Sequence, residues 1–209
     1  PKRGGEKFLT YPPKLNAESK LSYLYKTKNY SEFIKLAINL RKNIVISGGT
    51  SSGKTTYLNA CIKYIPKDQR LILLEDTREL KISHDNYVSL LASKGEQSRA
   101  NITMQDLVQC ALRLRPDRII MGEIRGKEIM DFVSACSTGH DGSLTSIHAN
   151  SPAGAFMRMV QLYKLNCVPS MRDDEILAQL KSIVDIVIQL NKTSKGRCVG
   201  GVYFKGVGL

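Results

Sequence analysis

The chain has 209 residues, a formal net charge of +12 and a hydrophobic fraction of 42%. These values are typical of one globular domain and argue against a disordered chain or a coiled coil, and no apolar run is long enough to cross a membrane. Because the basic residues are spread along the sequence rather than gathered in one block, nucleic acid as a partner is neither indicated nor excluded by composition.

Residues 1–16 combine glycine, proline and basic residues, and we expect them to form a linker. The chain starts at Pro1 without an initiator methionine, so we expect it to be a fragment of a longer protein. Apolar residues at helical spacing then predict two helices within residues 15–40. A polar break at residues 28–31 separates them, with Ser31 as the N-cap candidate of the second helix.

An apolar run at residues 44–46 leads into a loop of small residues, after which Gly53, Lys54 and Thr55 open a predicted helix. This is G-x-x-x-x-G-K-[ST] in its strand–loop–helix context, which is typical of a phosphate-binding loop. Small residues let backbone N–H groups turn toward phosphates, while Lys54 would reach the β- and γ-phosphates and Thr55 would bind Mg²⁺. The alternative, a turn with an unrelated lysine, leaves eight positions in register unexplained. The expected nucleotide-binding residues are Gly48, Gly49, Thr50, Ser51, Ser52, Gly53, Lys54, Thr55 and Thr56.

Downstream, short apolar segments alternate with amphipathic ones. Further strands are predicted at residues 70–76, 87–91, 118–123, 142–148, 183–190 and 198–204. Helices are predicted at residues 103–114, with Thr103 as N-cap, and at 128–136, 153–165 and 173–183, while residues 94–101 are predicted to form a mobile loop. The alternation predicts an α/β fold with a largely parallel sheet, helices on both faces and an antiparallel hairpin at one edge.

The five cysteines are scattered and contain no C-x-x-C pair, so no zinc-site spacing is present. Cys61, Cys110 and Cys136 fall on the apolar faces of predicted helices, and we expect all three to be core residues. Free thiols and a nucleotide site both fit a reducing cytoplasm.

Three predicted strands besides the first end in residues that carry chemistry, namely Glu75, Glu123 and His148. Because ligands of parallel sheets collect at the carboxyl ends of the strands, we expect one shared catalytic site. Hydrolysis needs an acidic group near the metal, usually through water, and a carboxylate that orients the attacking water, and Glu123 and Glu75 can divide these roles. How the carboxylates divide these roles stays open, and the alternative for each is to cap the next helix. His148 either contacts the γ-phosphate or is structural.

Phosphoryl transfer often recruits an arginine, from the same chain or from a neighbour. The order of residues does not choose among the candidates, which are Arg78, Arg99, Arg113, Arg115, Arg118 and Arg125.

Four segments occur in a recognisable order: GGTSSGKTT at 48–56, LEDTREL at 74–80, RPDRIIMGEIR at 115–125 and GSLTSIHAN at 142–150. They resemble the Walker A motif, Asp box, Walker B motif and His box of the secretion traffic ATPases, which power type II and type IV secretion and type IV pili. Within that family the chain is most similar to the type IV secretion ATPase, and it lacks the tetracysteine module of many relatives.

The resemblance implies that residues 17–209 form a RecA-like C-terminal ATPase domain that uses ATP and Mg²⁺, with Glu123, Glu75 and His148 as catalytic residues. It also implies an N-terminal domain ahead of the linker and a homo-hexamer in the full-length protein. Other secretion-system components would be partners, with peripheral association at the cytoplasmic face of the inner membrane. Two rival functions stay open: a RecA-like nucleic-acid-dependent ATPase, and an assembly platform that nucleotide gates without turnover.

Overall fold

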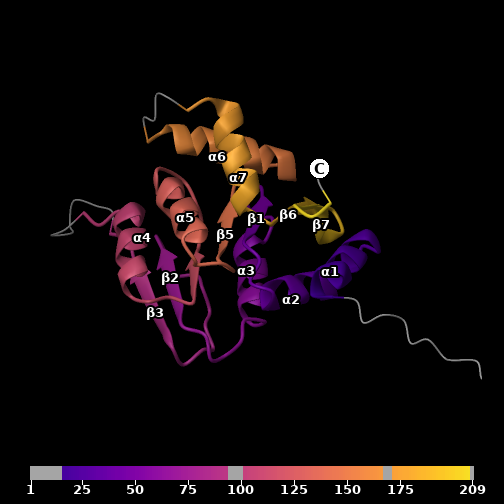
Figure 1. Ribbon diagram of the computed structural model, residues 1–209, viewed down its shortest axis with the longest axis horizontal. Coiled ribbons are helices and arrows are strands. Elements are labelled where there is room, and N and C mark those ends of the chain that lie inside the picture. The colour runs from indigo at the N-terminus through magenta and orange to yellow at the C-terminus, as the bar shows by residue number, and fades with distance from the viewer. Residues whose placement is uncertain (1–15, 94–100, 167–170, 208–209) are drawn as a thin grey trace, which may run out of the picture.

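The computed structural model describes residues 16–93, 101–166 and 171–207, which fold into one seven-stranded sheet flanked by helices (Figure 1). Five neighbouring strand pairs are parallel, and only β6 and β7 at one edge are antiparallel. The predicted sheet is therefore confirmed, whereas the predicted linker and the predicted loop at 94–101 lie almost wholly outside the described residues. In the order β3-β2-β4-β5-β1-β6-β7, the strands are Tyr87–Leu91, Leu71–Glu75, Arg118–Met121, Leu144–Ile147, Ile44–Gly48, Ile186–Thr193 and Gly196–Phe204.

Two separate apolar cores fix which helices cover which face of the sheet. One core unites side chains of α1, α2 and α3 with one face, and the other unites those of α4, α5, α6 and α7 with the opposite face. This matches the burial expected of a parallel sheet, whose central strands are apolar on both sides. The helices are α1 Ala17–Lys26, α2 Tyr30–Asn39, α3 Lys54–Ile62, α4 Met104–Arg113, α5 Glu128–Ser137, α6 Pro152–Lys164 and α7 Asp173–Ile183.

Strand β1 lies inside the sheet, between β5 and β6, and all five of its residues are buried. Its β-branched side chains suit a strand that packs on both faces. The parallel pairing brings the carboxyl ends of β1, β5, β4 and β2 to the same edge of the sheet. This edge is where the sequence places its candidate site residues.

The helix caps agree with the sequence at one predicted position and differ at another. Thr103 forms a capping box with Asp106 at the start of α4, as predicted. The predicted N-cap Ser31 is wrong, because α2 already begins at Tyr30 and the side chain of Asn29 accepts a hydrogen bond from the Glu32 N–H. Asparagine is as good an N-cap as serine, so the earlier residue takes the role.

Two of the three predicted core cysteines are buried. Cys61 and Cys136 have 2% and 4% exposure, and burial raises the pKa of each thiol to about 12, which keeps them protonated and unreactive. The prediction for Cys110 is wrong, because its side chain is exposed. It lies outside the buried stripe of α4, which is formed by Met104, Leu107, Val108 and Ala111.

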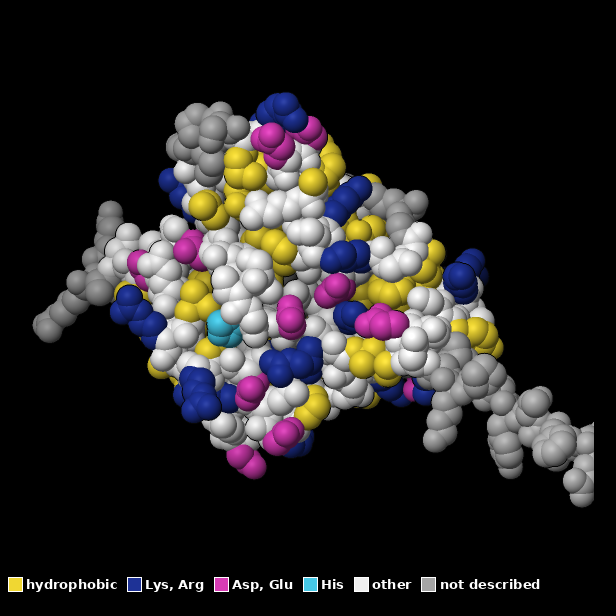
Figure 2. Space-filling model, in the orientation of Figure 1, with side chains coloured by type: hydrophobic (Ala, Val, Ile, Leu, Met, Phe, Trp, Pro, Cys, Tyr) yellow, Lys and Arg dark blue, Asp and Glu magenta, His cyan; other side chains and the backbone are white. Residues whose placement is uncertain are grey.

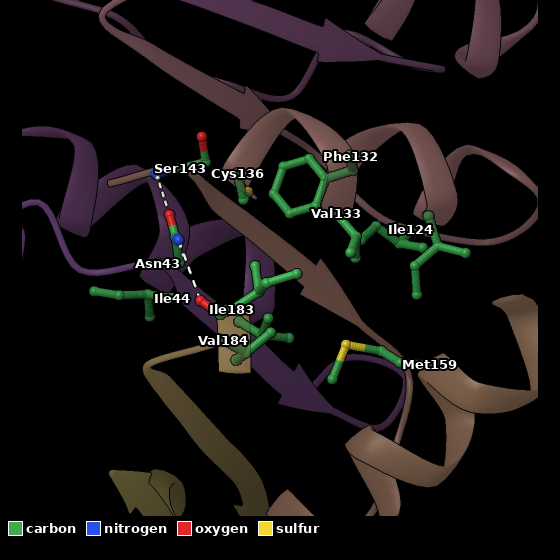
Figure 3. Close-up of a pocket in the computed structure, with 12 residues that line it drawn as sticks. Asn43, Ile44, Ile124, Phe132, Val133, Cys136, Ser143, Met159, Ile183 and Val184 are labelled. Atoms are coloured by element: carbon green, nitrogen blue, oxygen red, sulfur yellow. Dashed lines mark hydrogen bonds between the residues drawn. The ribbon is translucent and has the colours of Figure 1, made fainter. Parts of the chain in front are cut away.

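At the opposite, amino end of the strands, Asn43 ties three segments together (Figure 3). Its side-chain oxygen accepts the N–H groups of Gly142 and Ser143, and its amide nitrogen donates to the Ile183 carbonyl. The apolar side chains drawn around it line a void of only about 10 Å³, roughly the room that one water needs. This void is therefore a packing defect of the core rather than a ligand site.

Arg118, at the start of β4, is fully buried. Its guanidinium donates to Gln69 Oε1 at 2.6 Å, to the Gly142 carbonyl at 3.2 Å and to the Ile38 carbonyl at 2.7 Å. Burial lowers the pKa of Arg118 to about 10, so the group stays charged at neutral pH. Its hydrogen bonds therefore join β4 to the start of β5 and to the end of α2.

Candidate active site

The phosphate-binding loop leaves β1 at Gly48 and returns at Lys54, the first residue of α3. Two of its residues, Ser51 and Gly53, have left-handed backbone with φ of 58° and 94°. At Gly48 a Cβ atom would lie 2.3 Å from Ser52 Oγ and 3.0 Å from the Leu190 carbonyl oxygen, so a larger residue there would displace its neighbours. The loop is therefore a tight turn that opens directly into a helix N-terminus, which is the geometry of an anion cradle.

Lys54 is buried, with 8% exposure. Its ammonium donates to the carbonyls of Gly48 at 3.1 Å and Gly49 at 3.3 Å, and it lies 3.2 Å from Nε2 of His148. Burial lowers the pKa of Lys54, while nearby Glu123 opposes that effect. The lysine thus lies folded back over the loop with a desolvated charge, which favours an incoming anion.

A chain of contacts continues from Lys54 across the neighbouring strand ends. His148, after β5, places Nε2 3.1 Å from Glu123 Oε1, and Glu123, after β4, accepts from Arg125 at 3.0 Å. Arg125 also donates to Asp76, after β2, at 2.6 Å. The bond to Glu123 is the main cause that raises the pKa of Arg125. The structure therefore brings the predicted Lys54, Glu123 and His148 together.

The second predicted carboxylate, Glu75, has a different environment. It is 3% exposed, and Oε1 accepts the backbone N–H groups of Glu79 and Leu80, both at 2.7 Å. This arrangement holds the loop after β2 in place and favours the capping alternative for Glu75. Glu79, which the sequence patterns did not single out, extends from that loop and accepts a hydrogen bond from the Thr55 hydroxyl at 2.9 Å.

Glu79 was missed because it lies four residues beyond the end of its strand, where a carboxylate is usually a surface residue. Its spacing from Glu75 is the signal that could have identified it. A buried carboxylate at a strand end needs hydrogen-bond donors, and the backbone N–H groups a few residues later in the chain can supply them. Glu128 acts in a similar way behind Arg125, because its Oε1 accepts the N–H groups of Arg125 and Gly126.

The described residues fit a nucleotide with its metal. Ser52 Oγ, inside the loop, is buried and has no hydrogen-bond partner among the described atoms, as expected of a group that awaits a ligand. The described ranges also contain no set of three His, Cys, Asp or Glu side chains able to hold a metal alone. Mg²⁺ is usually held by one or two protein groups together with substrate phosphates, and Thr55 with Glu79 and Glu123 suits that pattern.

Among the candidate arginines that the structure describes, Arg125 is the one whose contacts reach this site. Arg118 is buried at the opposite end of β4, where it has a structural role, and Arg113 and Arg115 precede that strand. Arg78 is exposed, and Arg99 lies outside the described residues. Arg197, on β7, was not considered from sequence, yet its Nε donates to the Ser51 carbonyl of the phosphate loop at 3.1 Å.

On the face in Figure 2, acidic and basic side chains of the described residues are interspersed rather than divided into a continuous basic stripe. That distribution gives no particular support to a nucleic-acid groove on this face. In the described part of the chain, no helix combines the length and the apolar character that spanning a bilayer requires.

Comparison with known families gives a match over residues 13–202 to the model described as "Type II/IV secretion system protein". A relative from Bartonella quintana, "Type IV secretion system protein VirB11", is 36% identical over 188 residues, which are 90% of this chain and 53% of the relative. "Conjugal transfer protein TrbB" from Rhizobium radiobacter is 39% identical over 176 residues, 83% of this chain and 51% of the relative. The chain spans about half the length of the curated relatives it matches.

Solved structures give the same picture. The VirB11 ATPase of the Brucella suis type IV secretion system, in complex with sulphate, superposes with a TM-score of 0.83 at 33% identity, covering 90% of this chain and 57% of that one. The pilus retraction motor PilT with bound ADP superposes with a TM-score of 0.62 at 26% identity, covering 78% and 47%.

Proposed function

Because the chain belongs to the type II/IV secretion system protein family, we propose that it is the ATP-hydrolysing motor domain of a type IV secretion or related pilus system. The observation that carries the proposal is the contact chain from Lys54 through His148 to Glu123 at the end of the phosphate loop. A loop alone would indicate only nucleotide binding. An acid and an imidazole beside its lysine supply what hydrolysis needs in addition.

In this proposal the loop N–H groups and the N-terminus of α3 bind the phosphates, and Lys54 turns from the loop carbonyls toward the β- and γ-phosphates. Mg²⁺, when bound, neutralises charge on the phosphates during transfer. Glu123 positions the attacking water, and the bond from Arg125 at 3.0 Å orients its carboxylate. When substrate binds, His148 separates from Lys54 and donates a hydrogen bond to the γ-phosphate. Because His148 also contacts Glu123, it couples γ-phosphate binding to the position of that carboxylate.

We assign the remaining carboxylates by their surroundings. Glu79 faces the Thr55 hydroxyl and is placed to hold a water of the metal shell. Glu75 is a positioning residue, because it is buried and fixes the backbone of Glu79. If these assignments are correct, Glu79→Gln lowers turnover while leaving thermal stability unchanged, whereas Glu75→Gln lowers both.

The first test is nucleotide binding by Lys54→Ala, measured by calorimetry with ADP and by phosphate release in the assembled protein. We expect the affinity for ADP to fall by at least about tenfold and turnover to be lost, because the lysine's contact with the phosphates is removed. A tenfold loss of affinity corresponds to about 1.4 kcal/mol of binding free energy. Lys63→Ala, an exposed lysine on the turn that follows α3, is the matched control. Undiminished turnover in Lys54→Ala would disprove the proposed site.

Assembly and location belong to the same proposal. We propose that the whole protein forms a homo-hexamer that works with other secretion components at the cytoplasmic face of the inner membrane. The name of the Bartonella relative supports a secretion system as the setting. Solution mass with and without nucleotide tests the ring, and co-sedimentation with anionic vesicles tests the membrane association.

A further inference from the structure

Within the described ranges, four buried side-chain polar atoms have no hydrogen-bond partner, and three of them gather around the carboxyl end of β1. These three are the side-chain oxygens of Ser47, Ser52 and Gln189. Ser52 belongs to the phosphate loop, whereas Ser47 and Gln189 lie inside the sheet, on β1 and β6, with 0% and 3% exposure. Native proteins rarely bury an unpaired polar group, so the amide of Gln189 requires an explanation that packing does not supply.

The strand register places Gln189 across β1 from the segment that carries His148. Ser47 pairs with the last residue of β5 on one side and with Gln189 on the other. Side chains alternate along a strand, and Val45 and Val187, two residues earlier on β1 and β6, belong to the core beneath α4–α7. Ser47 and Gln189 therefore point to that same face. Because β1 ends one residue after Ser47, the long Gln189 side chain can pass its end toward β5.

The amide nitrogen of Gln189 has more acceptors than hydrogens. Nε2 donates toward the Ala149 carbonyl at 3.4 Å, the Leu190 carbonyl at 3.1 Å and Asn191 Oδ1 at 3.2 Å. A side-chain amide nitrogen carries two hydrogens, so it can satisfy only two of these acceptors at once. Oε1 finds no donor in the described part of the chain, so the nitrogen alone holds the amide in place. The contact with Ala149 is the longest of the three and the easiest to release.

Ala149 directly follows His148, so the contact from Gln189 influences where the imidazole lies. On the side of β4, the Ser146 hydroxyl donates to the Gly122 carbonyl at 2.7 Å and anchors β5. On the other side, beyond the last residue pair of β5 with β1, Gln189 reaches the segment from β6. If the Ala149 carbonyl turns away, both amide hydrogens of Gln189 still have acceptors, and the half-buried carbonyl can bind water. The segment can therefore move at little cost in hydrogen bonds.

We propose that Gln189 is a positioning residue for ATP hydrolysis. It holds the segment after β5, and with it His148, beside Lys54, and it releases that segment when the imidazole turns toward the γ-phosphate. The inference rests on the proposed function, in which His148 contacts the γ-phosphate. Because ADP has no γ-phosphate, ADP binding does not depend on Gln189, whereas turnover does.

The test measures phosphate release from ATP by the assembled protein, and ADP affinity by calorimetry. Gln189→Met keeps the length of the side chain but removes its donor. It should lower kcat about tenfold and leave KM and the ADP dissociation constant within about twofold, because a misplaced catalytic group costs rate rather than binding. Gln189→Asn, one methylene shorter, should lose the Ala149 contact and show the same loss. Gln161→Met, at an exposed position of α6, is the matched control.

A double-variant cycle separates positioning from structural support. If Gln189 acts through His148, adding Gln189→Met to His148→Ala should lower kcat no further. A further tenfold loss in that background would overturn the inference. Wild-type turnover in Gln189→Met or in Gln189→Asn would do the same, as would an equal loss of ADP binding and turnover.

Two further measurements distinguish this inference from the proposed function. Wild-type protein that neither binds ADP nor hydrolyses ATP would overturn the proposed function, whatever the variants do. Circular dichroism shows which variants keep the fold, and Gln189→Asn retains a buried amide where Gln189→Met does not. Unfolding of both variants would show that Gln189 is a structural residue and would overturn its positioning role.

Discussion

Charged and polar side chains cluster at both ends of the parallel strands. The cluster at the carboxyl end and the cluster at the amino end differ in solvent exposure and in hydrogen-bond partners. At the carboxyl end, the side chains of Arg125 and His148 are 56% and 44% exposed, and they contact other ionisable groups. At the amino end, Arg118 is fully buried, and its partners are backbone carbonyls and an amide.

This difference distinguishes a polar cluster that stabilises the fold from one that binds ligands and takes part in a reaction. A buried group whose donors all end on fixed neutral acceptors cannot exchange its partners without a large desolvation cost. Half-exposed groups can exchange partners for a ligand at small cost, because water covers the intermediate arrangements. The carboxyl end is therefore suited to binding and turnover, and the amino end is suited to holding the strands in register.

The largest effect is expected from Glu123→Gln at the carboxyl end. Phosphate release from ATP should fall by about 10² to 10³, because an amide can keep the bond from Arg125 but cannot orient water as an anion does. ADP affinity and the free energy of unfolding should stay close to wild type. Steady-state kinetics with the assembled protein measures this, and Glu32→Gln, at an exposed position of α2, is the control. Unchanged turnover would remove Glu123 from the mechanism.

Arg118→Met should have the opposite profile. It retains the apolar stem but removes the donors to the Gly142 carbonyl and Gln69 Oε1, and one of the donors to the Ile38 carbonyl. This should lower the free energy of unfolding by about 3 kcal/mol. Urea denaturation measures the loss, and ADP affinity of the folded fraction should not change. Arg113→Met, at an exposed position, is the matched variant. A loss similar to that of the control would mean that the buried cation is replaceable.

A smaller contrast is expected between Asn43, at the amino end of the strands, and Asn59 on α3, whose partners lie in the loop after β2. Asn43→Ala removes three hydrogen bonds from the buried amino end and should cost about 2 kcal/mol of unfolding free energy. Asn59→Ala, whose bonds to Glu79 and Lys81 are exposed, should cost less than about 1 kcal/mol. Equal losses in thermal or urea unfolding would contradict the comparison of the two ends.

The smallest effect concerns pH. Burial raises the pKa of Asp185 above its ordinary 3.8, an effect that the hydrogen bond from the Asn43 N–H partly opposes. The folded state then binds this proton more tightly than the unfolded state, so Asp185 makes stability rise as pH falls from the folded pKa toward 3.8. Asp185→Asn should remove that contribution from the pH profile of urea unfolding, whereas Asp68→Asn, on the surface, should not. A profile unchanged by Asp185→Asn would show that the shift is absent.

The sequence was sufficient to predict the helices and strands, and to predict the phosphate loop, Glu123 and His148 as parts of the candidate site. Strong local signals located β1, the loop and α3, since a strand, a glycine-rich turn and a helix start are each encoded within a few residues. Cys110 and Ser31 were misplaced, because an apolar stripe and a helix start shift by one or two positions at little energetic cost. Glu79 and Arg197 were missed, because each acts through a neighbour distant in sequence, Thr55 and Ser51 respectively.

By itself the sequence determined that a phosphate loop follows a buried strand, and that Glu123 and His148 end strands of the same sheet. Those facts depend on local chemistry and on the rule that parallel strands share one carboxyl edge. Only the tertiary structure decided that His148 lies between Lys54 and Glu123, that Glu75 supports Glu79, and that β7 brings Arg197 to the loop. Strand order and the register of the antiparallel edge set these contacts, and both result from packing across the whole sheet rather than from any one segment.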